Sequence, residues 1–150
     1  EISNKGHQFG YEKFSKLQVS SLIHLSRYLV KKYNIKKINV LGHSDIAFDR
    51  KKDPGEKFPW KLLARKGVGL WHKINSEKLK KFRKKKIHNA EKIKMINFLN
   101  KVGYYTKNLS KANLRKLISS FQRRFRPEVI NGKIDRECLV IAQKLSKLYY

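Results

Sequence analysis

The sequence predicts an α/β layer over residues 1–72, followed by a small all-α bundle of three helices. Three observations lead to this fold class. An amphipathic run over residues 12–33 precedes a short apolar run that ends at Gly42. The residues after position 90 then carry apolar side chains at helical spacing. A helix, a buried strand and a loop in this order are typical of a sheet covered by helices.

The N-terminal helix is expected over residues 12–33. Apolar side chains recur there near helical spacing, with lysines and serines between them. These apolar residues are Phe14, Leu17, Leu22, Leu25 and Leu29. Asn34 suits the end of the helix, and the run IKKINVLG after it suits a short buried strand. Gly42 ends this strand, so the following loop is expected at the carboxyl end of the sheet, where open sheets bind ligands.

The segment over residues 58–89 changes from apolar to basic. FPWKLLARKGVGLW predicts a short helix that is broken at its two glycines, with Trp60 and Trp71 packed into the protein. Residues 73–89 are predicted to form a linker or an exposed helix, because seven of the nine residues from Lys78 to Lys86 are cations. Such a run of cations usually indicates a solvent-exposed surface. Contact with nucleic acid or an envelope polymer is the more specific alternative.

Three short helices are predicted over residues 90–150. Ser110 suits the N-cap of the second helix, Pro127 stops it, and Asp135 can cap the third. The apolar positions are Ile93, Ile96 and Leu99 in the first helix, Leu114, Leu117, Ile118, Phe121 and Phe125 in the second, and Leu139, Ile141, Ala142, Leu145 and Leu148 in the third. Their spacing predicts one buried face on each helix.

The chain is strongly basic. Its 150 residues include 37 Lys or Arg and 11 Asp or Glu, which gives a formal net charge of +26. This charge favours polyanionic partners, although an AT-rich coding sequence explains the abundance of Lys, Ile and Asn equally well. Cys138 is the single cysteine and lies among apolar residues, which excludes a disulfide framework and favours a buried thiol. No run reaches the ~20 apolar residues of a membrane span.

The loop after Gly42 concentrates side chains that suit metal-assisted hydrolysis. It reads GHSDIAFDRKKDPGEKFPW over residues 42–60. His43 offers an imidazole nitrogen to a metal ion, and Asp53 reaches the same ion if the loop doubles back at its Pro-Gly pair. Lys51 and Asp53 would point the same way in an extended segment, where Lys51 could stabilise an oxyanion beside the metal. This spacing alone is common, so an ordinary loop is the alternative.

The series from Gly42 to Trp71 resembles the type 2 zinc-dependent N-acetylmuramoyl-L-alanine amidases. The shared motifs are Gly-His-Ser-Asp-Ile-Ala, Arg-Lys, Asp-Pro-Gly, Phe-Pro-Trp and Gly-x-Gly-x-Trp, without a gap over about thirty residues. The resemblance implies that His43 and Asp53 are zinc ligands and that Lys51 stabilises the transition state. It also implies that Glu1, in EISNKG, is the general base for the zinc-bound water. The implied fold is part of the amidase sheet with flanking helices.

The C-terminal part resembles the peptidoglycan-binding domain of the envelope branch of this family. LNKVGY and ISSFQRRFRPEVINGKIDRECLVIAQKL carry the resemblance, which includes a Phe-Gln-x-x-Phe pattern. The two phenylalanines of this pattern are expected in the bundle core rather than against sugar. The implied domains are the C-terminal half of an amidase catalytic domain over residues 1–72, a basic linker over 73–89 and a peptidoglycan-binding-like domain over 90–150.

The implied reaction is hydrolysis of the amide bond between N-acetylmuramic acid, ordinary or 1,6-anhydro, and the L-alanine of peptidoglycan stem peptides. Zn²⁺ is the implied cofactor, and peptidoglycan or muropeptides are the implied partners. The periplasm or cell envelope is the expected location, with the cytoplasm as the alternative. The family has a further histidine ligand on an upstream strand, and no histidine of this chain occupies that motif. The chain is therefore expected to be truncated at its N-terminus.

Two other functions are open. A truncated, inactive amidase would act only as a peptidoglycan-binding module. A basic nucleic-acid-binding protein is the second alternative, but the aromatic residues are not interleaved with the cations as a stacking platform for bases requires. Nucleic acid is therefore not expected as a partner.

Overall fold

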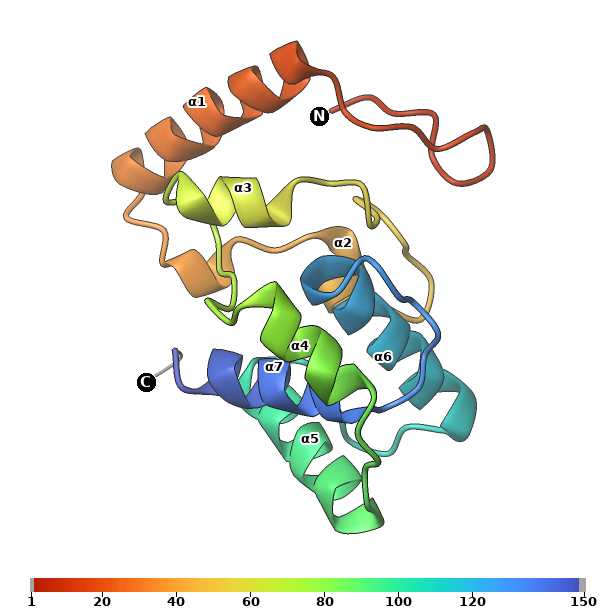
Figure 1. Cartoon of the computed structure of the whole chain (residues 1–150). Helices are drawn as coiled ribbons and strands as arrows, with labels where there is room; N and C mark the ends of the chain where they lie inside the picture. Colours follow the sequence, from red (N-terminus) through yellow and green to blue (C-terminus); the bar gives the residue numbers. More distant parts are fainter. Residues whose placement is uncertain (1, 149–150) are drawn as a thin grey trace.

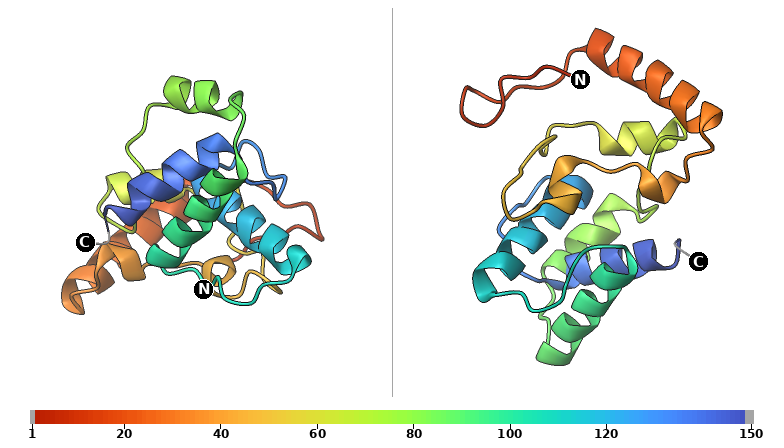
Figure 2. Two further views of the ribbon diagram at one scale, coloured as in Figure 1. Left: turned by 90° about the horizontal axis from the view of Figure 1, so that it is seen from below. Right: turned by 180° about the vertical axis from the view of Figure 1, so that it is seen from behind.

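A computed structural model describes residues 2–148 of the chain (Figure 1). The elements in order are α1 (Lys16–Lys32), the 3₁₀ turn η1 (Lys37–Asn39), α2 (His43–Ile46), α3 (Trp60–Arg65), α4 (Ser76–Arg83), α5 (Asn89–Lys101), α6 (Lys111–Phe125) and α7 (Arg136–Ser146). Helices α4 to α7 lie together, and α1 lies apart from them in both Figure 1 and Figure 2. The loops and short helices between α1 and α4 connect these two parts.

The predicted sheet is wrong: the chain contains no strand between residues 2 and 148. The apolar run IKKINVLG instead forms η1 and an extended segment. A strand needs a neighbouring strand to bond its backbone groups, whereas here these groups bond elsewhere. The Asn39 amide donates to the Lys36 carbonyl (2.9 Å), and the Val40 carbonyl accepts from the Arg124 guanidinium (2.9 Å). The α/β fold class is therefore replaced by an all-helical architecture in the described part.

Helix α1 begins later than the predicted residue 12 because a capping box fixes its start. The Ser15 hydroxyl accepts from the Gln18 amide (3.1 Å), and the Gln18 side chain accepts from the Ser15 amide (2.9 Å). Lys31 and Lys32 lie in the last turn, where cations favour the helix dipole. No residue of α1 is fully buried, and its Leu17 remains 81% exposed. The apolar stripe of this helix therefore lines an open cleft rather than the core.

The hydrophobic core lies between α4, α5, α6 and α7. Its fully buried members include Leu117, Ile118 and Phe121 from α6 and Ile141 and Leu145 from α7. Phe121 and Phe125 pack against each other with ring centroids 5.2 Å apart, which confirms that they belong to the core. The predicted caps are also present: Ser110 accepts from the Asn113 amide (3.1 Å), and Asp135 accepts from the Cys138 amide (2.8 Å).

The predicted buried face of α5 needs one correction. Ile93 is 60% exposed, whereas Met95 and Leu99 are fully buried. These two residues are four positions apart and therefore share a face, which packs on α7. Lysines lie beside both Ile93 and Met95, so the sequence does not show which of these two residues is on the buried face of α5. The face with Met95 is buried because α7 packs against it.

The basic segment after residue 75 forms helix α4, which packs against α7. Asn75 caps it by accepting from the Glu77 amide (2.8 Å), and Leu79 is buried in the core. Arg83 at its end donates to the buried carboxylate of Glu137 (3.0 Å between Nη2 and Oε1). Part of the segment predicted as a linker thus contributes to the helical core. The domain boundaries at residues 72 and 90 stay a prediction.

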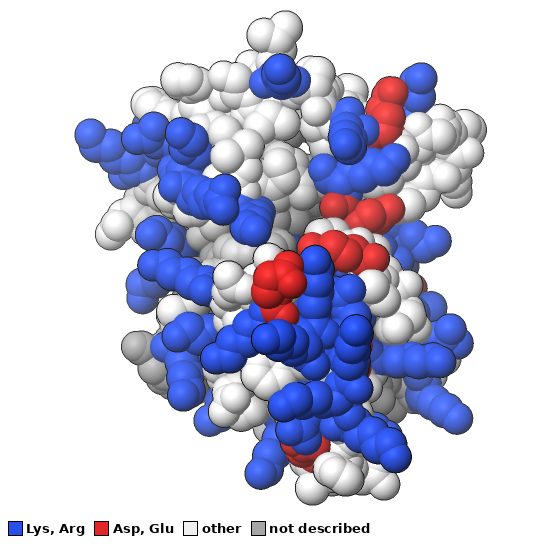
Figure 3. All heavy atoms as spheres, viewed as in Figure 1, with Lys and Arg blue, Asp and Glu red and all other residues white. Residues whose placement is uncertain are grey.

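Cations cover much of the surface. Figure 3 shows Lys and Arg over much of one face, most densely in its lower half, with the few Asp and Glu side chains mainly in its middle and upper parts. Several acidic side chains of the described residues belong to ion pairs, such as Glu77 with Lys80 (3.1 Å). Cys138 is fully buried, which confirms the predicted buried thiol, and burial raises the pKa of this thiol to about 12. None of the helices between residues 2 and 148 is long and apolar enough to cross a membrane.

Candidate functional site

The loop after Gly42 folds back on itself and brings its two ends together. Helix α2 begins at His43, and the Asp45 carboxylate accepts from the Gly42 amide (2.9 Å). The Ser44 amide donates to the Asp53 carbonyl (2.9 Å), which connects the start of the loop to a residue nine positions later. A Cβ on Gly42 would lie only 2.5 Å from the ring of Pro54, so a larger residue would force these ends apart.

This fold places His43 and Asp53 in direct contact. Nδ1 of His43 hydrogen-bonds to Oδ2 of Asp53, and the two side chains are 75% and 55% exposed. An imidazole nitrogen and a carboxylate oxygen side by side at a solvent-accessible position can supply two of the four ligands of a tetrahedral zinc site. Among residues 2–148, no group of three or more His, Cys, Asp and Glu side chains could hold a metal ion. The described residues therefore fit zinc as a pair of ligands, and a complete site needs further ones.

The structure describes only one of the two predicted catalytic residues, Lys51. Lys51 is exposed, and its amide donates to the Ala47 carbonyl (2.8 Å) in the turn that follows α2. It does not line the cleft that contains His43 and Asp53. Glu1 lies outside the described residues. The roles of both residues stay predictions.

A cleft of about 1040 Å³ contains the His43–Asp53 pair. One wall is the apolar stripe of α1, including Leu22, Leu25 and Leu29, and the rest comes from the N-terminal segment and from loop residues such as Trp60. The surface that lines this cleft is mainly apolar, and His43 and Asp53 are among its polar lining residues. Such a combination of apolar walls and a few polar groups is typical of ligand sites.

Tyr11 was not among the predicted site residues, yet it fixes the far end of the loop. Its hydroxyl donates to the Pro54 carbonyl (2.7 Å) and accepts from the Lys57 amide (3.0 Å). Burial raises the pKa of Tyr11 to about 12, and Glu56 contributes by its negative charge. Gly55, at φ +82°, sits against the Tyr11 ring. The neutral tyrosine thus holds the turn directly after Asp53, a role that no sequence motif signals.

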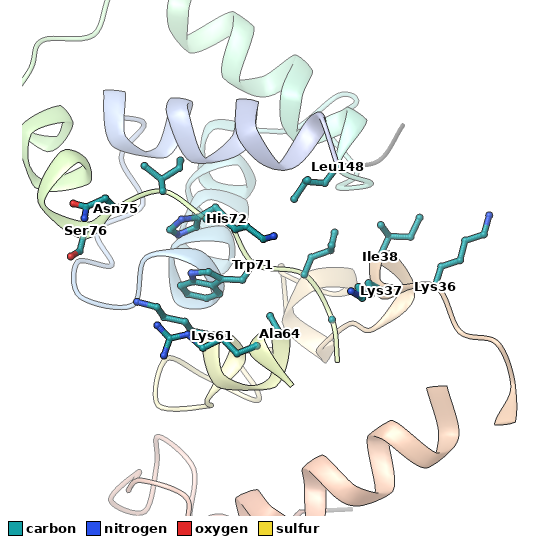
Figure 4. A pocket seen from close by; sticks show the side chains of 15 residues that line it. Lys36, Lys37, Ile38, Lys61, Ala64, Trp71, His72, Asn75, Ser76 and Leu148 are labelled. Carbon is teal, nitrogen blue, oxygen red and sulfur yellow. The ribbon is translucent and has the colours of Figure 1, made fainter. Parts of the chain in front are cut away.

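A second cleft, of about 940 Å³, lies away from this pair (Figure 4). Trp71 and His72 form its centre, with Lys61 on one side and Lys36 and Lys37 on the other. None of the predicted site residues lines it. Trp71 also contacts the core through Phe125, with ring centroids 5.9 Å apart, as the packing prediction required. This cleft is therefore separate from the candidate site.

His72 is a buried histidine that is expected to make stability depend on pH. Its Nε2–H donates to the Phe125 carbonyl (3.0 Å), and burial lowers its pKa below 6.5, with the charge of Lys61 acting in the same direction and the Phe125 carbonyl opposing it. In the unfolded chain His72 binds a proton at a higher pH than in the folded chain. The free energy of unfolding should therefore be highest above about pH 6.5 and should fall as the pH drops below it.

Urea unfolding between about pH 7.5 and 5.5 measures this effect. The matched variant is His72→Gln, whose side-chain amide keeps a donor for the Phe125 carbonyl but does not titrate. It should show a flatter dependence over this range. If the free energy of unfolding of His72→Gln depended on pH as steeply as that of the unmodified chain, other groups would cause the dependence.

The amino-acid sequence and the fold both match known amidases. Residues 1–56 match the family model described as N-acetylmuramoyl-L-alanine amidase. The N-acetylmuramoyl-L-alanine amidase AmiD of Escherichia coli (strain K12) is 32% identical over 155 residues, which cover 99% of this chain and 56% of AmiD. The chain thus spans little more than half the length of this relative.

Two solved structures resemble this fold. The complex of AmiD from E. coli with the substrate anhydro-N-acetylmuramic acid-L-Ala-D-gamma-Glu-L-Lys superimposes with a TM-score of 0.79 at 32% identity, over 93% of this chain and 55% of that one. AmpDh3 from Pseudomonas aeruginosa superimposes with a TM-score of 0.78 at 29% identity, over 94% of this chain and 56% of that one. Residues 1–56 of this chain, which include His43 and Asp53, therefore belong to the N-acetylmuramoyl-L-alanine amidase family.

Proposed function

We propose that this chain carries part of the active site of an enzyme that hydrolyses the amide bond between N-acetylmuramic acid and the L-alanine of peptidoglycan stem peptides. The main support for this proposal is the contact between Nδ1 of His43 and Oδ2 of Asp53, two residues that line the mainly apolar cleft. Both residues lie in the segment that matches the amidase family. The periplasm or cell envelope, where this substrate occurs, is the proposed location.

The substrate class rests on the relatives. AmiD has been solved with an anhydromuramyl tripeptide, and AmpDh3 with an anhydromuramic pentapeptide. We extend this class to the present chain, with a muropeptide in the cleft beside His43 and Asp53. The stem peptide carries carboxylates, so the cationic surface of the protein would raise its local concentration.

His43 and Asp53 are proposed to hold Zn²⁺, together with further ligands from outside residues 2–148. Bound zinc would polarise the substrate carbonyl and lower the pKa of a bound water to about 7. Lys51 is proposed to offer its charge to the amide oxygen of the substrate as negative charge develops there. Glu1 is proposed to remove the proton of the attacking water.

Replacing Asp53 tests the metal site directly. Asp53→Ala should abolish zinc binding, measured by titration calorimetry on a longer form of the protein that contains this chain and binds zinc, because it removes one of the two paired donors that the described residues supply. Asp49→Ala is the matched control, since Asp49 is an exposed aspartate in the same loop and should leave binding unchanged. Equal zinc affinity in the two variants would refute the ligand assignment.

Hydrolysis is tested with an anhydromuramyl tripeptide as substrate and release of the stem peptide as the signal. This chain and any longer form of the protein that contains it are assayed with zinc. Release that depends on Asp53 supports the amidase function. The alternative is a peptidoglycan-binding module without activity. That alternative predicts sedimentation with purified peptidoglycan and no release from any form.

A further inference from the structure

A buried carboxylate lies directly behind the candidate zinc ligand His43. Asp45 is only 7% exposed although it is two residues from a solvent-facing histidine. Its Oδ1 accepts from the Tyr104 hydroxyl (2.8 Å), and its Oδ2 accepts from the Gly42 amide (2.9 Å) and from the Arg124 guanidinium. Two of these three donors come from the C-terminal helical part of the chain. The loop is thus anchored to that part through a carboxylate.

Arg124 of α6 contacts the loop on both sides of His43. One Nη donates to the Asp45 carboxylate after it, and the other donates to the Val40 carbonyl before it (2.9 Å). The guanidinium also lies over the Trp60 ring, with its Cζ 4.1 Å from the ring centroid. Arg124 is 4% exposed. Its planar fork suits such a bridge, because it fixes the direction of several hydrogen bonds at once, which a lysine cannot do.

Ser120 adds a third anchor from the same helix. Its hydroxyl donates to the Ser44 carbonyl, in the turn between His43 and Asp45. The Ser44 amide meanwhile donates to the Asp53 carbonyl (2.9 Å). The backbone beside His43 is therefore held by α6 on one side and by Asp53 on the other. The imidazole ring faces solvent, where it meets the Asp53 carboxylate.

These contacts go beyond ordinary packing. A buried ion pair contributes little net stability compared with apolar residues of the same size, so its presence favours a specific geometry rather than strength. Here the pair spans 79 positions of sequence and ends beside the two candidate ligands. Outer-shell partners in metal sites hydrogen-bond to the ligand side chain and orient it. Arg124 and Tyr104 act one step further away, because they hold the turn that carries His43.

We propose that Arg124 and Tyr104 are positioning residues that fix the turn carrying His43, so that zinc binding by His43 and Asp53 depends on the C-terminal helices. The claim about zinc binding rests on the proposed function. The claim that α6 holds the turn carrying His43 is independent of it. The C-terminal helical part then has a role in the catalytic site besides any contact with peptidoglycan.

The test compares Tyr104→Phe and Arg124→Lys with Arg126→Lys in a form of the protein that contains this whole chain and binds zinc. Tyr104→Phe removes one hydroxyl and keeps the ring in the core. Arg126 is the matched control: it is also buried and paired, two positions from Arg124, but its carboxylate partners are Asp135 and Glu137. Arg126→Lys should therefore lower stability without touching the loop.

Two measurements are made by NMR on each variant. Zinc titration followed by the His43 ring signals should show affinity about 10–100-fold weaker in Tyr104→Phe and Arg124→Lys, as for other outer-shell partners. Hydrogen exchange of the Ser44 amide should accelerate in the same two variants, relative to the Leu99 amide of α5. Arg126→Lys should change zinc affinity by less than about twofold and should not accelerate Ser44 exchange selectively.

The possible outcomes test the anchoring of the turn and the dependence of zinc binding on it separately. Normal zinc affinity and normal Ser44 exchange in folded Tyr104→Phe would overturn the proposal, even if Arg124→Lys fails to fold. If Arg126→Lys weakened zinc binding and accelerated Ser44 exchange equally, general destabilisation would explain the effect and the proposal would also be overturned. If no form of the protein that contains this chain binds zinc, the proposed function and the dependence of zinc binding on α6 both fail, while faster Ser44 exchange still supports the anchoring of the turn.

Discussion

Replacing Lys51 with methionine is expected to lower the rate of muropeptide hydrolysis by about 10²–10³ while zinc stays bound. Methionine keeps much of the length of the side chain but removes the charge that would stabilise the developing oxyanion. Loss of one such donor costs about 3–4 kcal/mol in the transition state. The measurement is release of stem peptide at saturating substrate, in a form of the protein that shows activity, with zinc content determined on the same sample.

Lys52→Met is the matched control for this change. Lys52 is the neighbouring exposed lysine, and its loss changes the net charge equally. Because Lys51 does not line the cleft in the described structure, the expected effect requires its long side chain to reach the substrate. Similar rates for both variants would make Lys51 an ordinary surface cation, with a change in stability of no more than about 0.5 kcal/mol.

Glu137→Gln is expected to lower the free energy of unfolding by about 3–5 kcal/mol. The Glu137 side chain is 1% exposed and accepts hydrogen bonds from Arg83 of α4 and Arg126, the latter also 1% exposed. Neutralising the carboxylate leaves buried positive charge without full compensation. A loss of this size is a large share of the about 5–15 kcal/mol that stabilises a typical domain. Guanidinium unfolding followed by circular dichroism measures it.

Glu77→Gln is the control for this experiment. Glu77 also pairs with a cation, Lys80 at 3.1 Å, but both side chains are more than half exposed. Such a pair contributes about 0–1 kcal/mol, so this variant should unfold almost as the unmodified chain does. If Glu137→Gln lost no more stability than Glu77→Gln, the buried network would not hold α4 against α7.

Local signals in the sequence were sufficient for several elements. Ser110 and Asp135 cap helices as predicted, because a short polar side chain before an apolar periodic run satisfies amides that the helix leaves unbonded. Phe121 is buried as predicted because its helix has a single apolar face. The contact of His43 with Asp53 also follows from a loop that doubles back within ten residues. These features depend on neighbours along the chain.

The strand prediction failed for a physical reason. A β-strand is stable only when another strand bonds its backbone, and the apolar run at Val40 has no such partner among residues 2–148. Sequence periodicity describes the run itself and not its neighbours. The same limit explains Ile93, which has helical spacing but is exposed because α7 packs on the face of Met95.

The sequence by itself determined where most helices of the C-terminal part begin and end, and which loop carries the candidate ligands. The tertiary structure alone decided that Arg124 reaches Asp45 and Val40 on either side of His43. A basic side chain in a basic chain gives no sign of burial, and its partners lie about eighty positions away. Helix propensity, capping and turn formation act over a few residues, whereas a buried ion pair forms only when packing removes both groups from water.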